Sequence, residues 1–221
     1  MIAVGLAVAP MPAGAALVLS QSQVGTSFDV GFGGSVLGLI NQPNIGATGR
    51  FTLASVTDAG KTYNFTYALT NNSTVASQIR SFGLDVVGTA VKTATATGAF
   101  ATSYVNPLSG LIGSDLCFAA SSAGTCSLLG SSNVTMGQTG TGSFALSFAN
   151  AMSAITLDDF QVNYTGVLGL YGATGTGYVT SVVGQVSAAP EPATWLTLLL
   201  GFALVGAALR NISGVRHPRG A

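Results

Sequence analysis

Cys117 and Cys126 are the only cysteines in the chain, and their spacing is the first feature that suggests a defined chemistry. In an oxidising compartment an even pair of cysteines forms a disulfide, and the short loop closed by this pair would add about 2 to 3 kcal/mol of stability. A redox pair or a pair of metal ligands is the alternative, which requires a helix N-terminus, cationic neighbours or further ligands. The Ser-, Ala- and Gly-rich sequence between the cysteines offers none of these, so we predict a disulfide.

Residue types that commonly carry catalysis are scarce. His217 is the single histidine and lies near the C-terminal end, and Glu191 is the single glutamate. The region 16–187 therefore has no histidine for a Ser-His-Asp or Cys-His arrangement or for a zinc site. A glycosidase would have only aspartate pairs in that region. We expect no catalytic residue, no cofactor and no metal, and thus a protein that is not an enzyme.

Asp158 and Asp159 form the one pair of adjacent carboxylates. Neighbouring side chains on a strand point to opposite faces, so these two are expected to diverge. A calcium-binding loop that uses Asp158, Asp159 or Asp115 is the alternative. Arg80 is expected at a solvated strand position, and a buried ion pair with Asp85 or with another aspartate is the alternative for this residue.

Short stretches of alternating apolar and polar residues indicate the elements that would position these side chains. A period of two is typical of a strand with one buried face. The clearest stretches are 51–57, 63–70, 82–86, 144–148 and 160–164. Turn-forming residues such as Asp58-Ala59-Gly60 separate them. Two glycine-rich stretches, 130–142 and 168–177, are expected to be loops.

The region 16–187 is expected to form one mainly β domain, an antiparallel β-sandwich. The chain is 48% hydrophobic but only 6% charged, whereas soluble domains average about 25% charged residues. No cluster of basic residues suggests a nucleic-acid partner. The Phe and Tyr residues of the strands are expected in the core rather than on a sugar-stacking surface.

The C-terminal segment 188–221 has a different composition. Pro190-Glu191-Pro192 precedes an uncharged apolar run, 193–209, and Arg210 follows this run at the start of a dispersed basic tail. As a helix the run would rise about 25 Å, close to the roughly 30 Å of a membrane's hydrocarbon core. Trp195 stands where an interfacial aromatic belongs, and the cations after the run predict a cytoplasmic C-terminus. We therefore expect one transmembrane helix over 193–209.

The order of motif, apolar helix and basic end resembles a PEP-CTERM sorting signal. The residues that carry the resemblance are Pro190, Glu191, Pro192 and Trp195, followed by the run 193–209 and Arg210. The resemblance implies a partner, exosortase, a membrane-embedded cysteine peptidase and transpeptidase-like enzyme of Gram-negative bacteria that make exopolysaccharide. It also implies that the motif 190–195 is the recognition element, that Arg210 marks the inner boundary of the membrane, and that processing near Pro190 removes the helix.

The region before the motif resembles the group of PEP-CTERM proteins called cistern. Four segments in the same order carry this resemblance, namely 67–73, 77–85, Cys117 with Cys126, and 157–160. No catalytic residue is implied for this group.

Residues 1–15 are apolar and end in Ala13-Gly14-Ala15, which is typical of the cleavage end of a secretory signal peptide. A signal peptide begins with a basic region, but no Lys or Arg lies near Met1. We therefore expect the translation start to lie upstream. Cleavage after Ala15 would leave an exported portion that begins at Ala16.

These features predict a non-enzymatic exported protein. Its precursor would be anchored in the inner membrane through 193–209, and exosortase would sort it to the cell envelope or the extracellular matrix, in association with exopolysaccharide or biofilm. The alternative is a surface carbohydrate-binding or adhesive module with a plain C-terminal membrane anchor. An exposed aromatic cluster would favour the alternative, and a smooth face of Thr and Ser would favour the matrix protein.

Overall fold

The computed structural model describes residues 16–36, 44–106, 114–120, 126, 134–167 and 174–184. All of them belong to one compact unit of the chain, Met1–Ser187. The predicted signal peptide 1–15 and the predicted sorting signal 188–221 lie outside the described residues. Within the described part, the helical segments are two 3-10 turns, η1 (Gln21–Gln23) and η2 (Asp58–Gly60). No helix of this part is long and apolar enough to cross a membrane.

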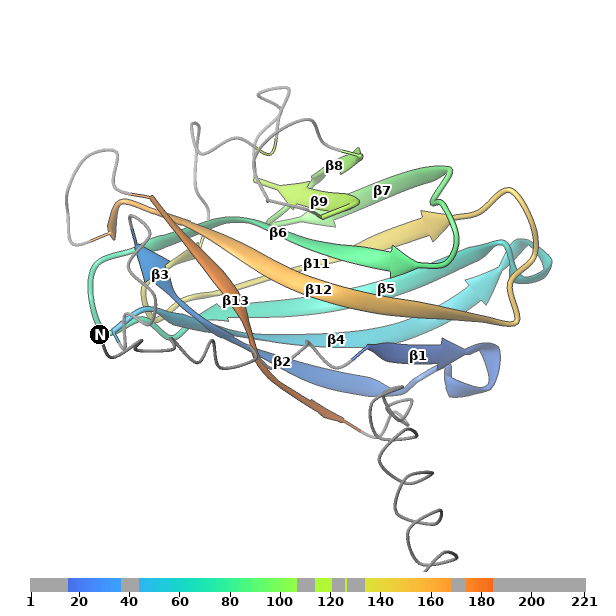
Figure 1. Ribbon diagram of the computed structural model, residues 1–221, viewed down its shortest axis with the longest axis horizontal. Coiled ribbons are helices and arrows are strands. Elements are labelled where there is room, and N and C mark those ends of the chain that lie inside the picture. Colours follow the sequence, from blue (N-terminus) through green and yellow to red (C-terminus); the bar gives the residue numbers. More distant parts are fainter. Residues whose placement is uncertain are drawn as a thin grey trace, which may run out of the picture. The chain divides into compact units, whose positions relative to one another are not determined.

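The strands form two antiparallel sheets arranged as a sandwich, which confirms the predicted antiparallel β-sandwich of this region (Figure 1). We call the first one the β5 sheet, and its strand order is β7 (Thr93–Gly98), β11 (Thr139–Ser147), β5 (Thr62–Asn71), β4 (Gly46–Thr57) and β2 (Ser27–Gly33). We call the second one the β6 sheet, and its order is β12 (Ala154–Thr165), β6 (Gln78–Val87), β9 (Leu116–Ala119) and β8 (Thr102–Val105). Three short strands extend the pairing: β1 (Leu17–Ser20) pairs with β12, β10 (Val134–Thr135) with β6, and β3 (Ser35–Val36) with β13.

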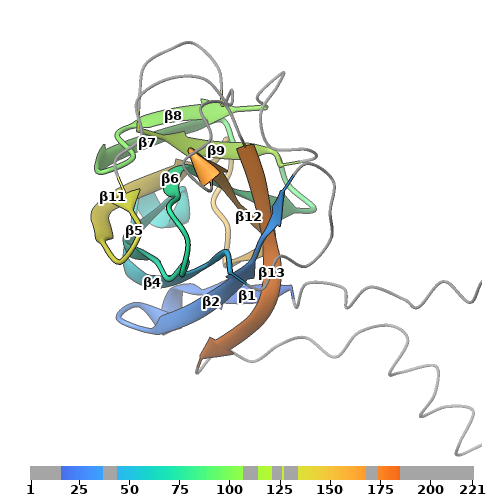
Figure 2. The ribbon, with the colours of Figure 1, turned by 90° about the vertical axis from the view of Figure 1, so that its left-hand side faces the viewer.

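One long strand, β13 (Thr174–Gly184), connects the two sheets on one side of the sandwich. Its first half pairs with β12, and its second half pairs with β2 in a ladder whose register shifts between Val179 and Ser181. Figure 2 shows β13 running from the β6 sheet to the β5 sheet. Because one strand pairs with both sheets, they are held together by backbone hydrogen bonds as well as by core packing.

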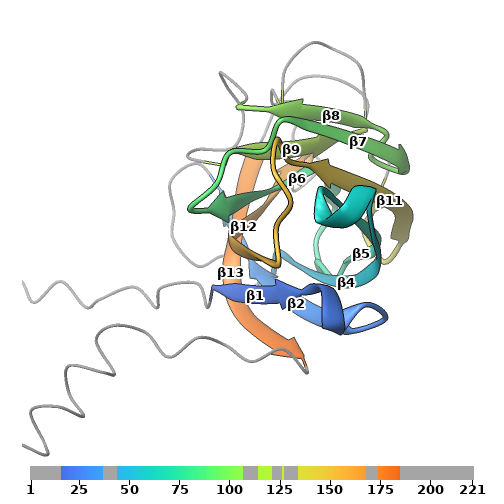
Figure 3. The same ribbon diagram turned by 90° about the vertical axis from the view of Figure 1, so that its right-hand side faces the viewer.

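The opposite ends of the strand order, β7 and β8, also meet. They lie next to each other in Figures 2 and 3. The hydroxyl of Ser103 in β8 donates a hydrogen bond of 2.7 Å to the backbone carbonyl of Ala94 in β7. The two sheets are therefore linked at both sides of the sandwich.

The core between the sheets is rich in aromatic rings, as predicted. Every phenylalanine in the described part of the chain is buried. The ring centroid of Phe82 in β6 lies 5.2 Å from that of Tyr67 in β5. The ring of Phe118 in β9 lies 4.6 Å from that of Phe144 in β11. These contacts join the two sheets through aromatic packing, which stabilises the sandwich beyond the burial of apolar area.

The five predicted strand stretches are confirmed, because each coincides largely with one observed strand, namely β4, β5, β6, β11 or β12. The prediction that the glycine-rich stretches are loops is wrong for part of each, since β11 begins at Thr139 and β13 at Thr174. In β11 the glycines belong to the strand, and a steric reason explains why two of these positions are glycine. A side chain at Gly140 would collide with Val134, and one at Gly142 would collide with Tyr67. Glycine is needed at these positions because neighbouring side chains cross the strand there.

Candidate functional site

The exposed face of the β5 sheet carries regular rows of hydroxyl groups, and we call it the hydroxyl face. Thr and Ser alternate with buried apolar residues along each strand, so the hydroxyls gather on one side. The central row crosses five strands and consists of Ser27, Thr52, Thr66, Ser143 and Thr97, each opposite the next.

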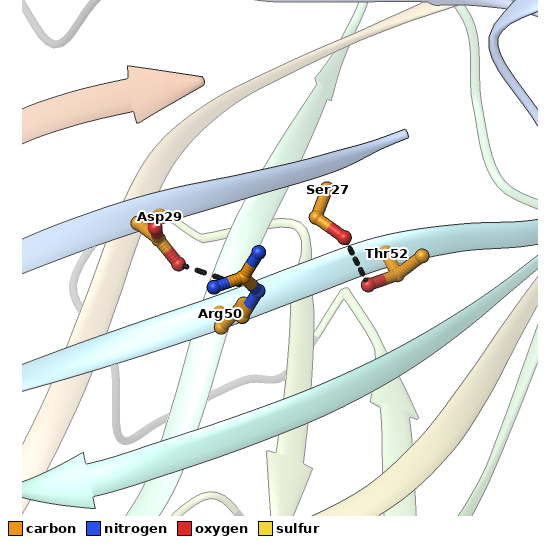
Figure 4. A network of polar contacts seen from close by, with 4 residues as sticks. All are labelled: Ser27, Asp29, Arg50 and Thr52. Carbon is orange, nitrogen blue, oxygen red and sulfur yellow. Dashed lines mark hydrogen bonds and ion pairs between the residues drawn. The ribbon is translucent and has the colours of Figure 1, made fainter. Parts of the chain in front are cut away.

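Neighbouring hydroxyls on this face pair with each other across the strands. Ser27 and Thr52 share a hydrogen bond of 2.7 Å, which Figure 4 shows beside the ion pair of Asp29 and Arg50. The hydroxyls of Thr97 and Ser143 share one of 2.8 Å. Each hydroxyl can donate one hydrogen bond and accept two, so the paired groups can still bind further polar groups.

A shallow, open hollow of about 220 Å³ lies on the hydroxyl face. Its lining includes the polar side chains of Asn64, Thr66, Thr95, Thr97 and Ser143, together with Ala54 and Ala145. No charged residue and no exposed aromatic ring lines it. Several hydrogen-bonding side chains therefore converge on this concave feature of the described surface.

Two features of the strands create the hollow. Ala145 stands between Asn64 and Thr95 in the register, and its small side chain leaves a gap among longer neighbours. Ala54 is an extra residue in β4, where the register with β5 shifts between Leu53 and Ser55. Bulges of this kind bend the strand and redirect side chains.

The ion pair on this face lies outside the hollow. The Nε atom of Arg50 is 4.0 Å from Oδ1 of Asp29, and the side chains are 64% and 44% exposed (Figure 4). Exposed pairs contribute about 0 to 1 kcal/mol, because water screens them. Because neither residue lines the hollow, the lining itself carries no charge.

Carboxyl groups gather near Asp85 in the β6 sheet. Asp158 lies directly opposite Asp85 in the register, and the backbone N–H of Asp115 donates a hydrogen bond to Oδ1 of Asp85. Burial is the main cause that raises the pKa of Asp85 from 3.8 to about 6. The hydrogen bond from Asp115 opposes this shift, and repulsion by the carboxylates of Asp115, Asp159 and Asp158 adds to it. Asp85 therefore titrates near neutral pH.

The expected divergence of Asp158 and Asp159 is not what the structure shows. A bulge interrupts β12 here, because the register with β6 shifts between Asp158 and Gln161 and the φ angle of Asp159 is 45°. The backbone N–H of Asp159 donates to Oδ1 of Asp158 at 2.8 Å. Strict alternation does not hold in a bulge, and both carboxylates act on Asp85. Even so, the described residues include no group of three or more His, Cys, Asp or Glu side chains arranged to hold a metal ion.

Arg80 is buried rather than solvated, so that prediction is wrong. Only 4% of the residue is exposed, because β6 has an extra residue opposite the step from Asn163 to Tyr164. Burial lowers the pKa of its guanidinium, and no carboxylate contributes to the shift. Among the described residues Nη1 of Arg80 has no hydrogen-bond partner, and the alternative ion pair with Asp85 is not formed.

The predicted disulfide between Cys117 and Cys126 is present. The two Cα atoms are 6.3 Å apart, and both residues are buried. Tyr104 of β8 stands opposite Cys117 in the register and packs against the pair. The bond therefore attaches Cys126 to the central part of the β6 sheet.

The predicted sorting residues lie outside the described part of the chain. They are Pro190, Glu191, Pro192, Trp195 and Arg210. The motif, the membrane helix 193–209 and the cytoplasmic tail 210–221 remain predictions.

Sequence reasoning did not find the hollow. A signal was present, because Thr93-Ala94-Thr95-Ala96-Thr97 alternates strictly. That pattern places the threonines on one face but does not tell which residues stand opposite them. Only the register places Ala145 between Asn64 and Thr95.

Comparisons with protein-family models, curated proteins and solved structures find no match to this chain.

Proposed function

We propose that this chain is a non-enzymatic exported protein of the cell envelope or extracellular matrix, associated with exopolysaccharide or biofilm. In this proposal exosortase recognises the motif 190–195, and the helix 193–209 holds the precursor in the inner membrane with the C-terminus in the cytoplasm. Processing near Pro190 then releases the domain. The observation that carries the proposal is the single glutamate, Glu191, placed between two prolines and followed by an uncharged run and Arg210.

The surface of the domain supports a matrix role over a binding module based on aromatic stacking. Every described phenylalanine is buried, and the large apolar residues that the described part exposes are Val24, Val87 and Met136. The hydroxyl face is rich in Thr and Ser, and no aromatic residue is among the exposed large apolar residues of the described part. The disulfide of Cys117 and Cys126 supports export, because such bonds persist in oxidising compartments.

Intact mass spectrometry of the mature protein tests this proposal. We expect wild-type cells to contain a species that ends near Pro190, and cells with Glu191→Ala to retain the full C-terminal length in the membrane fraction. Asp29→Asn, a change on the exposed face of the domain, is the matched control and should be processed like the wild type. If the wild-type protein and Glu191→Ala both keep residues 193–209, or if deletion of exosortase leaves the mass unchanged, the segment is a plain anchor.

A second candidate function is a surface carbohydrate-binding or adhesive module that uses such a plain anchor. The observation that favours it is the hollow on the hydroxyl face. Retention of the C-terminal helix together with glycan binding would favour this candidate.

A further inference from the structure

The hollow on the hydroxyl face extends across the strands rather than along one of them. The residues that line it come from β4, β5, β11 and β7, which are consecutive in the sheet. Neighbouring strands are about 4.8 Å apart, so the hollow spans roughly 14 Å. It is open to solvent, so a chain longer than the hollow can lie across it and continue beyond both ends.

The lining of the hollow combines hydroxyl, amide and methyl groups. Thr66, Ser143 and Thr97 belong to one row of the register and form a wall of hydroxyls. Asn64 adds a side-chain amide, whose Nδ2 donates to Ser55 at 3.1 Å and thereby fixes its orientation. The methyl groups of Ala54 and Ala145 supply the apolar part of the lining.

This lining suits a ligand that is uncharged and has many hydroxyl groups attached to an apolar frame. Thr and Ser hydroxyls both donate and accept hydrogen bonds, as sugar hydroxyls do, and the alanine methyls can contact the C–H groups of a sugar ring. A charged group would find no countercharge in the lining, and a flat aromatic ligand would find no exposed ring to stack on, because the lining residues Phe65 and Phe144 are buried.

We propose that this hollow is a binding site for a segment of a neutral polysaccharide. The inference rests on the proposed function in one respect, since that function places the domain among exopolysaccharide. It adds the site and the chemical class of the glycan. Each contact is weak because water competes for the hydroxyls, so binding depends on several residues acting together.

The test uses the purified full chain in detergent and affinity electrophoresis in gels that contain a soluble polysaccharide. Hydroxyethyl cellulose and galactomannan are the neutral probes, and alginate is the acidic one. Ala145→Tyr fills the hollow. Ala68→Tyr is the matched control, because Ala68 lies on the same face of β5 beside Arg50 and Thr141, outside the hollow.

We expect at least one neutral probe to retard the wild-type protein and alginate not to retard it. Ala145→Tyr should weaken binding at least tenfold, and Ala68→Tyr less than twofold. The double change Thr66→Val and Thr97→Val keeps the shape of the wall but removes two hydroxyls, and should weaken binding at least threefold with an unchanged melting temperature.

Three results would overturn the inference: no retardation by either neutral probe, retardation by alginate alone, or equal binding by Ala145→Tyr and Ala68→Tyr. Processing near Pro190 is measured separately in cells that express Ala145→Tyr. Normal processing without glycan binding by the wild type would reject the glycan site and leave the sorting proposal standing. Glycan binding without processing would reject the sorting proposal and leave the glycan site standing.

Discussion

Tyr67 of β5 crosses directly over Gly142 of β11, its partner in the register. Its hydroxyl donates a hydrogen bond of 3.0 Å to the backbone carbonyl of Thr97 and accepts one of 2.9 Å from the backbone N–H of Phe100. The tyrosine therefore ties the central strand of the β5 sheet to the edge strand β7 and to the connection that leads to β8. The absence of a side chain at position 142 makes this crossing possible.

Gly142→Ala should strongly destabilise the domain. A Cβ atom at this position would collide with the backbone carbonyl of Thr97 and with the hydroxyl of Tyr67, and a backbone collision is not relieved by rotating a side chain. We expect a loss of about 3 kcal/mol or more in the free energy of unfolding. Urea denaturation measures it, with Thr141→Ala, an exposed position on the same strand, as the control that changes by less than about 0.5 kcal/mol.

Tyr67→Phe should remove the two hydrogen bonds and leave the ring packing in place. The N–H of Phe100 loses its acceptor in a buried position, and an unpaired buried donor costs about 1 to 3 kcal/mol. The same denaturation experiment measures this loss. A free energy of unfolding equal to that of the wild type would show that the hydroxyl does not hold the connection after β7.

Asp85→Asn should stabilise the domain at neutral pH and remove part of its pH dependence. The folded-state pKa is about 6, above the ordinary 3.8, so the folded state binds more protons between these values. The stability that this protonation contributes is fully present below pH 3.8 and is lost as the pH rises through about 6. A shift of two units corresponds to at most about 3 kcal/mol, and because the carboxyl group is partly exposed we expect about 1 to 2 kcal/mol.

Urea denaturation at about pH 4 and about pH 7 tests the prediction for Asp85. The amide oxygen of Asn can still accept the hydrogen bond from the N–H of Asp115, so the variant removes the charge alone. Asp29→Asn, at an exposed carboxylate, is the matched control. Parallel pH profiles for the wild-type protein and Asp85→Asn would contradict the assignment.

Arg80→Met should raise stability, because the buried guanidinium loses its hydration while its Nη1 finds no hydrogen-bond partner among the described residues. Methionine keeps most of the length of the side chain and removes the charge. We expect a gain of about 1 to 3 kcal/mol in the free energy of unfolding at pH 7. Arg50→Met is the control, since that guanidinium is 64% exposed, and should change stability by less than about 1 kcal/mol. Loss of stability in Arg80→Met would indicate that the cation has a stabilising partner.

Much of the fold follows from local patterns along the chain. The alternation in 63–70 predicts a strand with one buried face, because the period of two is a property of the extended backbone itself. The same argument predicts that the aromatic residues of these strands form the core. The disulfide can be predicted because Cys117 and Cys126 are the only cysteines of the chain, so no other pairing within it is possible. The proposed sorting of the protein also rests on the sequence alone, since Glu191 and its neighbours form a local motif.

The tertiary structure decides the features that depend on pairing between distant segments. Gly142 lies in a stretch that local composition assigns to a loop, but it pairs with Tyr67 in the β5 sheet, and glycine is required there because Tyr67 occupies the space of a side chain. Arg80 and Asp159 lie at irregularities of the β6–β12 ladder, where alternation no longer predicts which way a side chain points. The hollow exists because Ala145 is placed between Asn64 and Thr95 by register. Local sequence does not encode register on its own, since register results from the simultaneous packing of both sheets around one core.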